Sequence, residues 1–522
     1  MATTRRDFIQ AIGKAGGFSA AYLAMQGMGL LPNYANAQPL KLQPGSGKGV
    51  KIVILGAGIA GLASADELLK AGYDVTILEA RDRVGGHNWT VRNGDKVEWT
   101  DGSVQTASYD ADQYFNTGPA RLPSHHQAVL GYCRELGIEL EVEVNVSRSA
   151  YLRNANANGG KPVQFRQAIN DTRGHVSELL AKAIGKGALD QDFSAADKER
   201  MLGFLRQYGD LNPDMFYKGS KRSGYKPGML PGAADAVGVA KDPLDMSTLL
   251  DIDMWNNVIF EDSIDDQATM FQPVGGMDAI PKALARKIGL AVFKLSSEVK
   301  EIRRIGGPNG KGARIVYLDK KTGQTQEVLA DYVICTIPLP VLAKIPADFS
   351  DAIAKNIGDV YYGNAVKIGF ESRRFWEQDY QVYGGISFTK DPGATIWHPS
   401  GGYHKPKGIT VYYIYMGGEA VTMKPQAQQH VFAAREIDAI FPGSGRELGK
   451  PIVINWGKIP YNEGNKANLT EGDPIYATMN KADGPFYFAN DWLSHAGWQE
   501  GAIQSARYTV AAIDKRVHAG KV

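Results

Sequence analysis

The sequence has very few cysteines: Cys133 and Cys335 are the only two among 522 residues. They do not form a C-x-x-C pair, and the chain has no cluster of cysteine and histidine. The ligand spacings of zinc and iron–sulfur sites are therefore missing. We expect no metal site and no disulfide bond.

Net charge is also nearly absent, because 58 Lys and Arg residues are balanced by 56 Asp and Glu residues. Without residues 1–37 the chain carries 55 of each. A nucleic-acid-binding domain usually shows a basic excess, so we expect no nucleic-acid partner. The composition is 43% hydrophobic and 22% charged, as in globular proteins, and the length predicts more than one domain.

A long apolar run suited to a membrane is missing as well. The weakly apolar stretch 11–31 contains Lys14 and several glycines, which makes it a poor anchor. It follows TRRDFI (4–9), which resembles a twin-arginine export signal, and precedes ANA (35–37), an A-x-A-like cleavage site. We expect residues 1–37 to be removed on export to the periplasm or beyond, without a membrane anchor. An ordinary amphipathic N-terminal helix is the alternative.

GAGIAG occupies residues 56–61, between a predicted strand at 50–55 and a predicted helix at 60–71. A dinucleotide-binding fingerprint requires this strand–turn–helix order. Gly56 would permit the sharp turn, and Gly58 would let the backbone approach a pyrophosphate. Ala60 would lie at the helix start that faces the phosphates, and Gly61 would let the helix pack on the strand. The alternative is a tight turn without a ligand.

After the next predicted strand (74–78), Glu79 offers a carboxylate that suits ribose hydroxyls. It begins EARDRVGG (79–86), which resembles the second flavin motif, E-A-x-x-R-x-G-G-R, of the flavin-dependent amine oxidases. The resemblance implies FAD contacts at Ala80, Arg81, Gly85 and Gly86. This chain departs from the motif at its last position, where His87 replaces the family's Arg.

TGPARLP (117–123) resembles the G-P-x-R-[IL]-P segment of L-amino-acid oxidases. In that family the Arg binds the substrate carboxylate, which implies this role for Arg121, with Ala120 and Arg121 also beside the cofactor. The alternative is a loop arginine that pairs with a nearby acid.

Residues 121–250 are mainly helical in pattern. Ser124 is expected to cap a helix that extends to about residue 136, with His125 and His126 in its first turn and no catalytic role assigned to either. Apolar residues at three- and four-residue spacing predict further helices at 166–184, 194–208 and 233–239. In the resembling family such a region forms part of the substrate funnel.

Alternating and aromatic strands between 346 and 481 predict a second, mixed sheet. One of them contains Lys367 ahead of RFW (374–376), which resembles the family strand whose Lys holds a water against the flavin. The alternative is a Lys on the polar face of a half-buried strand. Trp397 lies near a family aromatic that contacts the substrate, and a core aromatic is the alternative.

Near the C-terminus, GWQEGA (497–502) resembles the family's G-[WY]-x-E-G-A signature. The resemblance implies substrate contacts at Gly497 and Trp498, and cofactor contacts at Val299, Asp491, Trp498, Gln499 and Ala502. No cysteine occurs where monoamine oxidases link their flavin, so we expect FAD to be bound noncovalently.

The resemblance covers most of residues 50–517 and implies an α/β fold: a discontinuous Rossmann-like FAD-binding domain, a mixed-sheet substrate domain and a helical insertion. We predict an export signal (1–37), a linker (38–49), an FAD domain (50–120, 270–345 and 482–522), a helical domain (121–250) and a substrate domain (251–269 and 346–481).

The implied function is FAD-dependent oxidation of L-amino acids by oxygen to 2-oxo acids, ammonia and hydrogen peroxide, with Arg121 and Lys367 as catalytic residues. An amine or polyamine oxidase, an amino-acid 2-monooxygenase and a non-oxidase FAD-binding protein, either a flavin-dependent dehydrogenase or a noncatalytic scaffold, are the alternatives. Homo-oligomerisation is left open.

Overall fold

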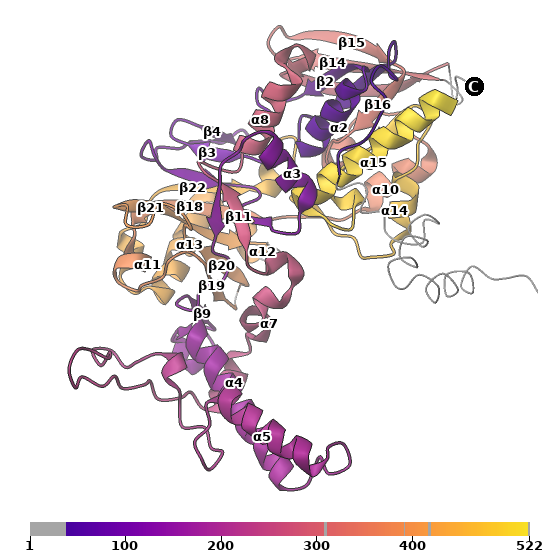
Figure 1. Cartoon of the computed structure of the whole chain (residues 1–522). Helices are drawn as coiled ribbons and strands as arrows, with labels where there is room; N and C mark the ends of the chain where they lie inside the picture. The colour runs from indigo at the N-terminus through magenta and orange to yellow at the C-terminus, as the bar shows by residue number, and fades with distance from the viewer. Residues whose placement is uncertain (1–37, 307–310, 391, 416–418, 520–522) are drawn as a thin grey trace, which may run out of the picture.

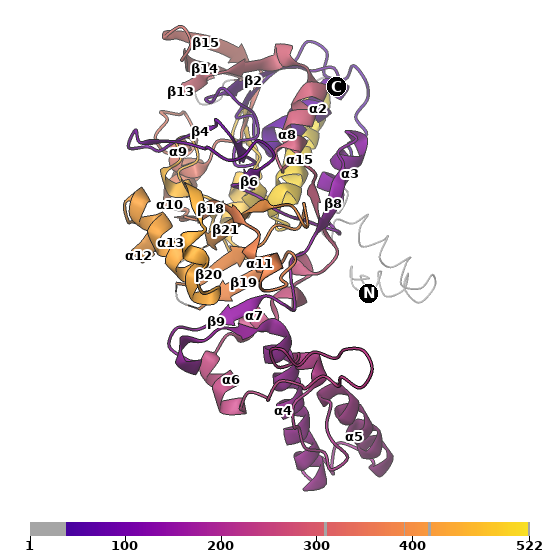
Figure 2. The same ribbon diagram turned by 90° about the vertical axis from the view of Figure 1, so that its left-hand side faces the viewer.

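A computed structural model describes residues 38–306, 311–390, 392–415 and 419–519. The predicted export signal lies outside these residues. Within them, no helix is both long and apolar enough to cross a membrane. Figures 1 and 2 show a body of two adjoining β-sheet regions and an arm of two helices that projects from it.

The first region is a five-stranded parallel sheet, which draws on four separated stretches of the chain. Its strands, in spatial order, are β12 (Phe293–Leu295), β2 (Asp74–Glu79), β1 (Lys51–Leu55), β16 (Tyr332–Cys335) and β24 (Phe486–Phe488).

Both faces of this sheet are covered, as a parallel sheet requires. Because side chains alternate along a strand, Ile52 and Ile54 of β1 pack into the core beneath three helices, α2 (Ile59–Lys70), α8 (Ala279–Ile288) and α15 (Trp498–Ala519). Val53 and Leu55 pack on the opposite side against an antiparallel sheet. That sheet consists of β13 (Ser297–Ile305), β14 (Gly312–Asp319) and β15 (Gln324–Ala330).

The second region is a seven-stranded sheet, antiparallel except where β19 runs parallel to β9. It is therefore mixed, as predicted. Its strands, in spatial order, are β10 (Val163–Gln164), β9 (Tyr151–Arg153), β19 (Ile386–Thr389), β20 (Ala394–Trp397), β21 (Lys407–Ile414), β18 (Val366–Arg373) and β22 (Gly449–Asn455). Helices α11 (Phe375–Gln378) and α13 (Gln426–Ile440) contribute to its core.

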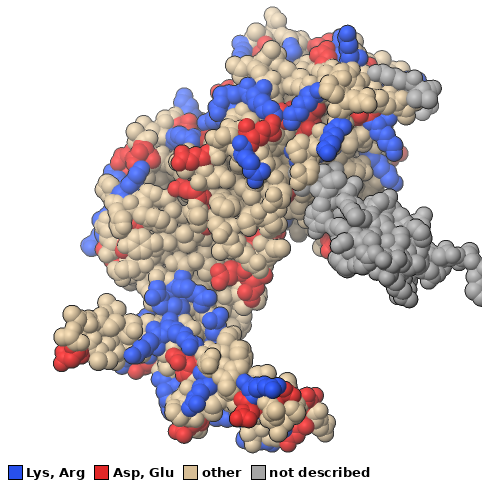
Figure 3. Space-filling view, viewed as in Figure 1, with Lys and Arg blue, Asp and Glu red and all other residues tan. Residues whose placement is uncertain are grey.

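The projecting arm consists of α4 (Phe165–Gly185) and α5 (Ala195–Gly209), which contact each other. Both helices confirm predictions. Ser194 caps α5, because its side chain accepts from the backbone N–H of Asp197. Figure 3 shows both charge signs on this face, with Lys and Arg gathered where the arm joins the body.

The helix predicted at 233–239 is wrong. This segment folds back on itself: Gly232 N–H donates to the Ala236 carbonyl, and Ala234 has a positive φ of 56°. Val237 and Val239 are exposed, so the apolar spacing finds no core to pack against. A short segment without such packing does not sustain a helix.

The remaining elements are short and connect these regions. The small sheets are β3 (Thr90–Arg92) with β6 (Tyr114–Asn116), β4 (Lys96–Glu98) with β5 (Val104–Thr106), β17 (Tyr362–Gly363) with β23 (Lys466–Ala467), and β7 (Leu122–Pro123) with β11 (Met270–Pro273) and β8 (Leu140–Glu143). The other α-helices are α3 (Gln127–Glu135), α6 (Met246–Ile252), α7 (Trp255–Val258), α9 (Leu339–Leu342), α10 (Asp351–Asp359), α12 (Glu419–Thr422) and α14 (Pro474–Met479).

Candidate active site

A cavity of about 730 Å³ lies between the two main sheets. Its first wall follows the carboxyl ends of four parallel strands, at Gly56, Glu79, Thr336 and Asn490. Ligands of open α/β sheets bind at this edge. The opposite wall comes from the seven-stranded sheet, through Lys367 on β18, Trp397 on β20 and Tyr413 on β21. The volume falls in the range of small-molecule and cofactor sites.

The nucleotide end matches the predicted fingerprint. Glu79 is 5% exposed, and its carboxylate accepts from Ala57 N–H at 2.8 Å and from Arg81 N–H at 2.9 Å. Gly56, Gly58 and Ala60 line the cavity. Gly61 does not: a Cβ there would lie 2.1 Å from the Gly56 carbonyl oxygen, so Gly61 serves helix–strand packing.

The second motif continues this wall. Gly85 forms a bridge with Gly58, and both line the cavity together with Ala80, Arg81 and Gly86. The Arg81 guanidinium donates to the Asn462 side chain and to the Pro460 carbonyl. Val299, Ala120, Asp491 and Ala502, for which the resemblance implies cofactor contacts, also line the cavity.

His87, which replaces the family's Arg, is neutral. Burial, with Lys367 as the next cause, lowers the pKa of His87 to about 3. Its ring lies 4.0 Å from that of Trp456, measured between centroids. The carbonyl oxygen of His87 explains why residue 118 is a glycine: a Cβ at Gly118 would lie only 2.0 Å from that oxygen.

Five cavity-lining residues carry buried polar atoms without a partner among the described residues: Nδ1 of His87, Oδ1 of Asn88, Nε of Arg121, Oδ1 of Asn465 and Nε2 of Gln499. Gln499 is held by Asn88, whose Nδ2 donates to its Oε1 at 2.7 Å. Buried polar groups normally have hydrogen-bond partners, so these atoms fit a ligand that carries both hydrogen-bond donors and acceptors. The flavin of FAD has both, and the residues present fit it.

Lys367 lies in the cavity wall with only 6% exposure. Its ammonium donates to the carbonyl of Asn116 at 3.3 Å and to that of Gly118. Burial, followed by repulsion from Arg121, lowers the pKa of Lys367 to about 7. An ammonium has three N–H donors, so one remains for a water or ligand.

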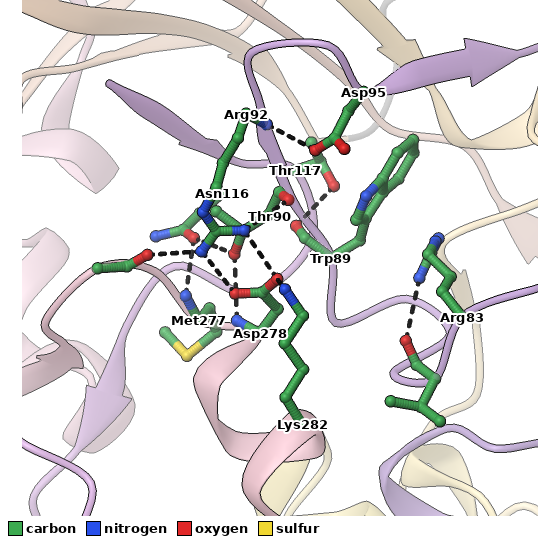
Figure 4. Close-up of polar contacts among 12 residues, drawn as sticks. Arg83, Trp89, Thr90, Arg92, Asp95, Asn116, Thr117, Met277, Asp278 and Lys282 are labelled. Carbon is green, nitrogen blue, oxygen red and sulfur yellow. Dashed lines mark hydrogen bonds and ion pairs between the residues drawn. The ribbon is translucent and has the colours of Figure 1, made fainter. Parts of the chain in front are cut away.

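Asn116, whose carbonyl Lys367 contacts, is held in place by its own side chain, and Figure 4 shows these polar contacts. Asn116 Oδ1 accepts from Thr90 and from the backbone of Met277. The carboxylate of Asp278, at the start of α8, accepts two hydrogen bonds from the Arg92 guanidinium, at 2.8 and 2.9 Å. It also forms an ion pair with Lys282. Bidentate pairs of this kind fix geometry as well as charge.

Arg121 lies in the same wall, surrounded by aromatic rings. Its guanidinium carbon is 4.8 Å from the ring centroid of Trp397, 5.2 Å from that of Trp498 and 5.5 Å from that of Phe260. Its Nη2 donates to Asp266 at 2.7 Å and its Nη1 to Asn145 at 2.8 Å. The alternative interpretation, a loop arginine paired with an acid, therefore describes this conformation.

Several residues of the site were not predicted. Phe260 and Asp266 line the cavity, but they belong to an acid-rich stretch without a recognisable motif. Glu500 is 2% exposed, and its carboxylate accepts from the backbone N–H groups of Ala128 and Val129 at the start of α3. Only tertiary structure reveals these pairings.

Two predictions at the cavity edge need correction or qualification. Helix α3 begins at Gln127 with His126 as its N-cap residue, so the cap at Ser124 is wrong and the histidines precede the helix. The Ser124 carbonyl instead accepts from the Gln127 side chain. Gly497 does not line the cavity, whereas Trp498 does.

Comparisons with known proteins agree with this geometry. The family model of flavin containing amine oxidoreductases matches residues 59–514. The chain is 25% identical over 500 residues to the flavin-dependent L-tryptophan oxidase RebO of Lentzea aerocolonigenes, covering 89% of this chain and 98% of that protein. It is 25% identical over 473 residues to the putative L-amino-acid oxidase YobN of Bacillus subtilis, covering 87% and 92%.

Solved structures share the fold. Cyclohexylamine oxidase from Brevibacterium oxydans matches with a TM-score of 0.59 at 17% identity, covering 90% of this chain and 99% of that one. Putrescine oxidase with bound putrescine matches with a TM-score of 0.58 at 19% identity, covering 89% and 98%. The predicted family and α/β fold class are confirmed, and the chain belongs to the flavin-containing amine oxidoreductases.

Proposed function

We propose that the chain is an L-amino-acid oxidase with noncovalently bound FAD. Each turnover would consume one L-amino acid, one oxygen and one water, and would yield a 2-oxo acid, ammonia and hydrogen peroxide. We also propose that it acts after twin-arginine export, on the strength of the N-terminal motif.

The observation that carries this proposal is a guanidinium in the cavity wall. The Arg121 side chain is 12% exposed, and its planar group lies beside the indoles of Trp397 and Trp498. A guanidinium binds carboxylates through paired N–H groups. Asp266 demonstrates that a carboxylate can reach this position. The carboxylate of an amino acid would replace it.

The chain's other residues would orient the substrate rather than transfer protons. With its carboxylate on Arg121 and its side chain against Trp397 and Trp498, the substrate's α-carbon would point into the cavity towards Lys367. When bound, FAD would supply the two-electron chemistry, as cofactors generally do. The substrate amine must be neutral for the α-hydrogen to leave with its electron pair.

The pairing of Arg121 with Asp266 favours a second candidate, an amine oxidase. A carboxylate-free amine would give Arg121 no partner from the substrate, and an unpaired charge in a buried site is costly. In this conformation that cost does not arise, because the Asp266 carboxylate already pairs with Arg121. A simple amine could enter without breaking any ion pair.

Matched substrate pairs separate the two candidates. We would measure peroxide release from L-amino acids, their D-enantiomers and the amines made by deleting the carboxylate, with the product identified. An L-amino-acid oxidase converts the L-amino acid much faster than its amine and yields the 2-oxo acid. Equal rates on the pair would reject the proposal in favour of the amine oxidase, and a decarboxylated amide product would indicate a monooxygenase.

A further inference from the structure

His125, His126 and Asp265 form a cluster beside the cavity, and none of the three lines it. Their ligand atoms all lie within 4.8 Å of one another. Oδ1 of Asp265 is 2.9 Å from Nε2 of His125 and 3.4 Å from Nε2 of His126. The two imidazole rings meet edge to face, with centroids 4.6 Å apart.

These separations suit a shared metal ion. With zinc–ligand bonds of about 2.0–2.1 Å, neighbouring ligands of a tetrahedral ion lie roughly 3.3 Å apart. The distances from the Asp265 oxygen to the two histidine nitrogens are both close to this ligand–ligand distance. Two imidazoles and one carboxylate form a donor set that zinc and similar divalent ions accept, with a water in the fourth position.

The electrostatic surroundings do not oppose a cation here. The cluster adjoins the start of α3, where free N–H groups would normally repel positive charge. Glu500 neutralises this end, because its carboxylate accepts from Ala128 and Val129 at 2.9 and 3.0 Å. His126 is 2% exposed and His125 is half-exposed, so the site has one anchored ligand and an open side.

We propose that His125, His126 and Asp265 bind one divalent ion of the zinc class, a site that the cysteine and histidine spacing of the sequence does not indicate. The site joins the residues before α3 to the 3₁₀ turn Ile264–Asp266. Asp266, the next residue of that turn, holds Arg121. A bound ion would therefore restrict the movement that releases Asp266 from Arg121.

The binding test uses untagged, cofactor-loaded protein freed of metal with EDTA and titrated with ZnCl₂ in a calorimeter. We expect one Zn²⁺ per chain in the wild type. His125→Ala and Asp265→Asn each remove a metal ligand, so the affinity for Zn²⁺ should fall roughly tenfold or more. Even removing a group that only hydrogen-bonds to a metal ligand typically lowers metal affinity about 10- to 100-fold.

His518→Ala is the matched control, because His518 also pairs with an aspartate, Asp514 at 3.4 Å, but without a second histidine in the pair. It should bind Zn²⁺ like the wild type. Absence of saturable binding, or unchanged affinity in His125→Ala, would overturn the proposal. This readout needs no turnover, so it stands or fails separately from the proposed oxidase function.

The coupling to Arg121 has its own test, which rests on the proposed function. Saturating Zn²⁺ should raise the KM of the wild type for L-amino acids several-fold and should leave the KM of His125→Ala unchanged. If Zn²⁺ binds but KM does not change in the wild type, the ion is structural and the coupling to Asp266 is wrong.

Discussion

Arg121 donates from Nη2 to Oδ1 of Asp266 over 2.7 Å, and its Nη1 donates to Asn145. Its Nε is buried and has no partner among the described residues. Two of the five guanidinium N–H groups are therefore occupied. In the proposed binding mode the substrate carboxylate takes the place of Asp266, because burial raises the pKa of Asp266 and makes its charge costly despite Arg121.

The first prediction concerns Asp266→Asn, which keeps the side-chain size but removes the competing charge. A neutral acceptor bonds Arg121 about half as strongly as a carboxylate. For an amino-acid oxidase, KM for L-amino acids should fall, on the order of tenfold for about 1.4 kcal/mol. For an amine oxidase, the substitution leaves Arg121 uncompensated, so KM for amines should rise. Steady-state kinetics on an L-amino acid and its decarboxylated amine measures whether KM falls or rises in Asp266→Asn.

The second prediction concerns Arg121 itself. Truncating one partner of a buried charge pair costs roughly 2–5 kcal/mol, which is roughly 30- to several-thousand-fold in kcat/KM. Arg121→Met should lose this much activity on L-amino acids and keep its flavin content. Arg121→Lys should recover only part, because an ammonium lacks the planar fork. Full activity in Arg121→Met would remove the carboxylate clamp from the mechanism.

Local motifs made the nucleotide end of the site predictable. Gly56, Gly58 and Glu79 act through backbone turns and one strand end, so their spacing in the chain fixes their spacing in space. Arg121 and Lys367 were found by resemblance. Asp266 was not, because it lies 145 positions from Arg121 and nothing local marks the pairing. The failed helix prediction at 233–239 came from apolar spacing without a core.

The third prediction is that purified protein is yellow and releases intact FAD when denatured. The two cysteines that could form a thioether are buried, at Cys133 on α3 and Cys335 at the end of β16, and neither lines the cavity. Acid precipitation followed by chromatography of the supernatant measures the released flavin. Colour that stays with the precipitated polypeptide would contradict noncovalent binding.

The fourth prediction uses Glu143, the last residue of β8, which is 6% exposed. Burial raises its pKa from 4.5 to about 7, although Arg121 opposes the shift. The folded state therefore binds the Glu143 proton more tightly than the unfolded state does. This difference adds to the free energy of unfolding fully below pH 4.5, and the contribution is lost as pH rises through 7. Above pH 7, Glu143→Gln should be the more stable protein, by at most roughly 3 kcal/mol.

Thermal unfolding at pH 5 and pH 8 tests this, with the exposed Glu139→Gln as a control. The difference in Tm between Glu143→Gln and wild type should grow with pH, whereas that of the control should not. A difference in Tm independent of pH would show that Glu143 is charged in both states.

The last prediction assigns Lys367 to the reaction of the reduced enzyme with oxygen. Reduction of oxygen develops negative charge, and a preorganised cation stabilises it. With its pKa lowered to about 7, Lys367 is a cation below pH 7 and neutral above. The rate of reoxidation should therefore be high at pH 6 and fall as pH rises through 7. Lys367→Met should slow it on the order of 10²-fold, with little dependence on pH.

Lys367→Arg separates charge from mere packing. A guanidinium keeps its proton at every pH used, so this variant should lose the pH dependence while retaining part of the rate. Stopped-flow mixing of reduced enzyme with oxygen measures the step apart from substrate binding, which depends on Arg121. If wild type and Lys367→Met reoxidise at equal rates, Lys367 only anchors the Asn116 and Gly118 carbonyls. Its loss would then appear as a lower Tm rather than as slower chemistry.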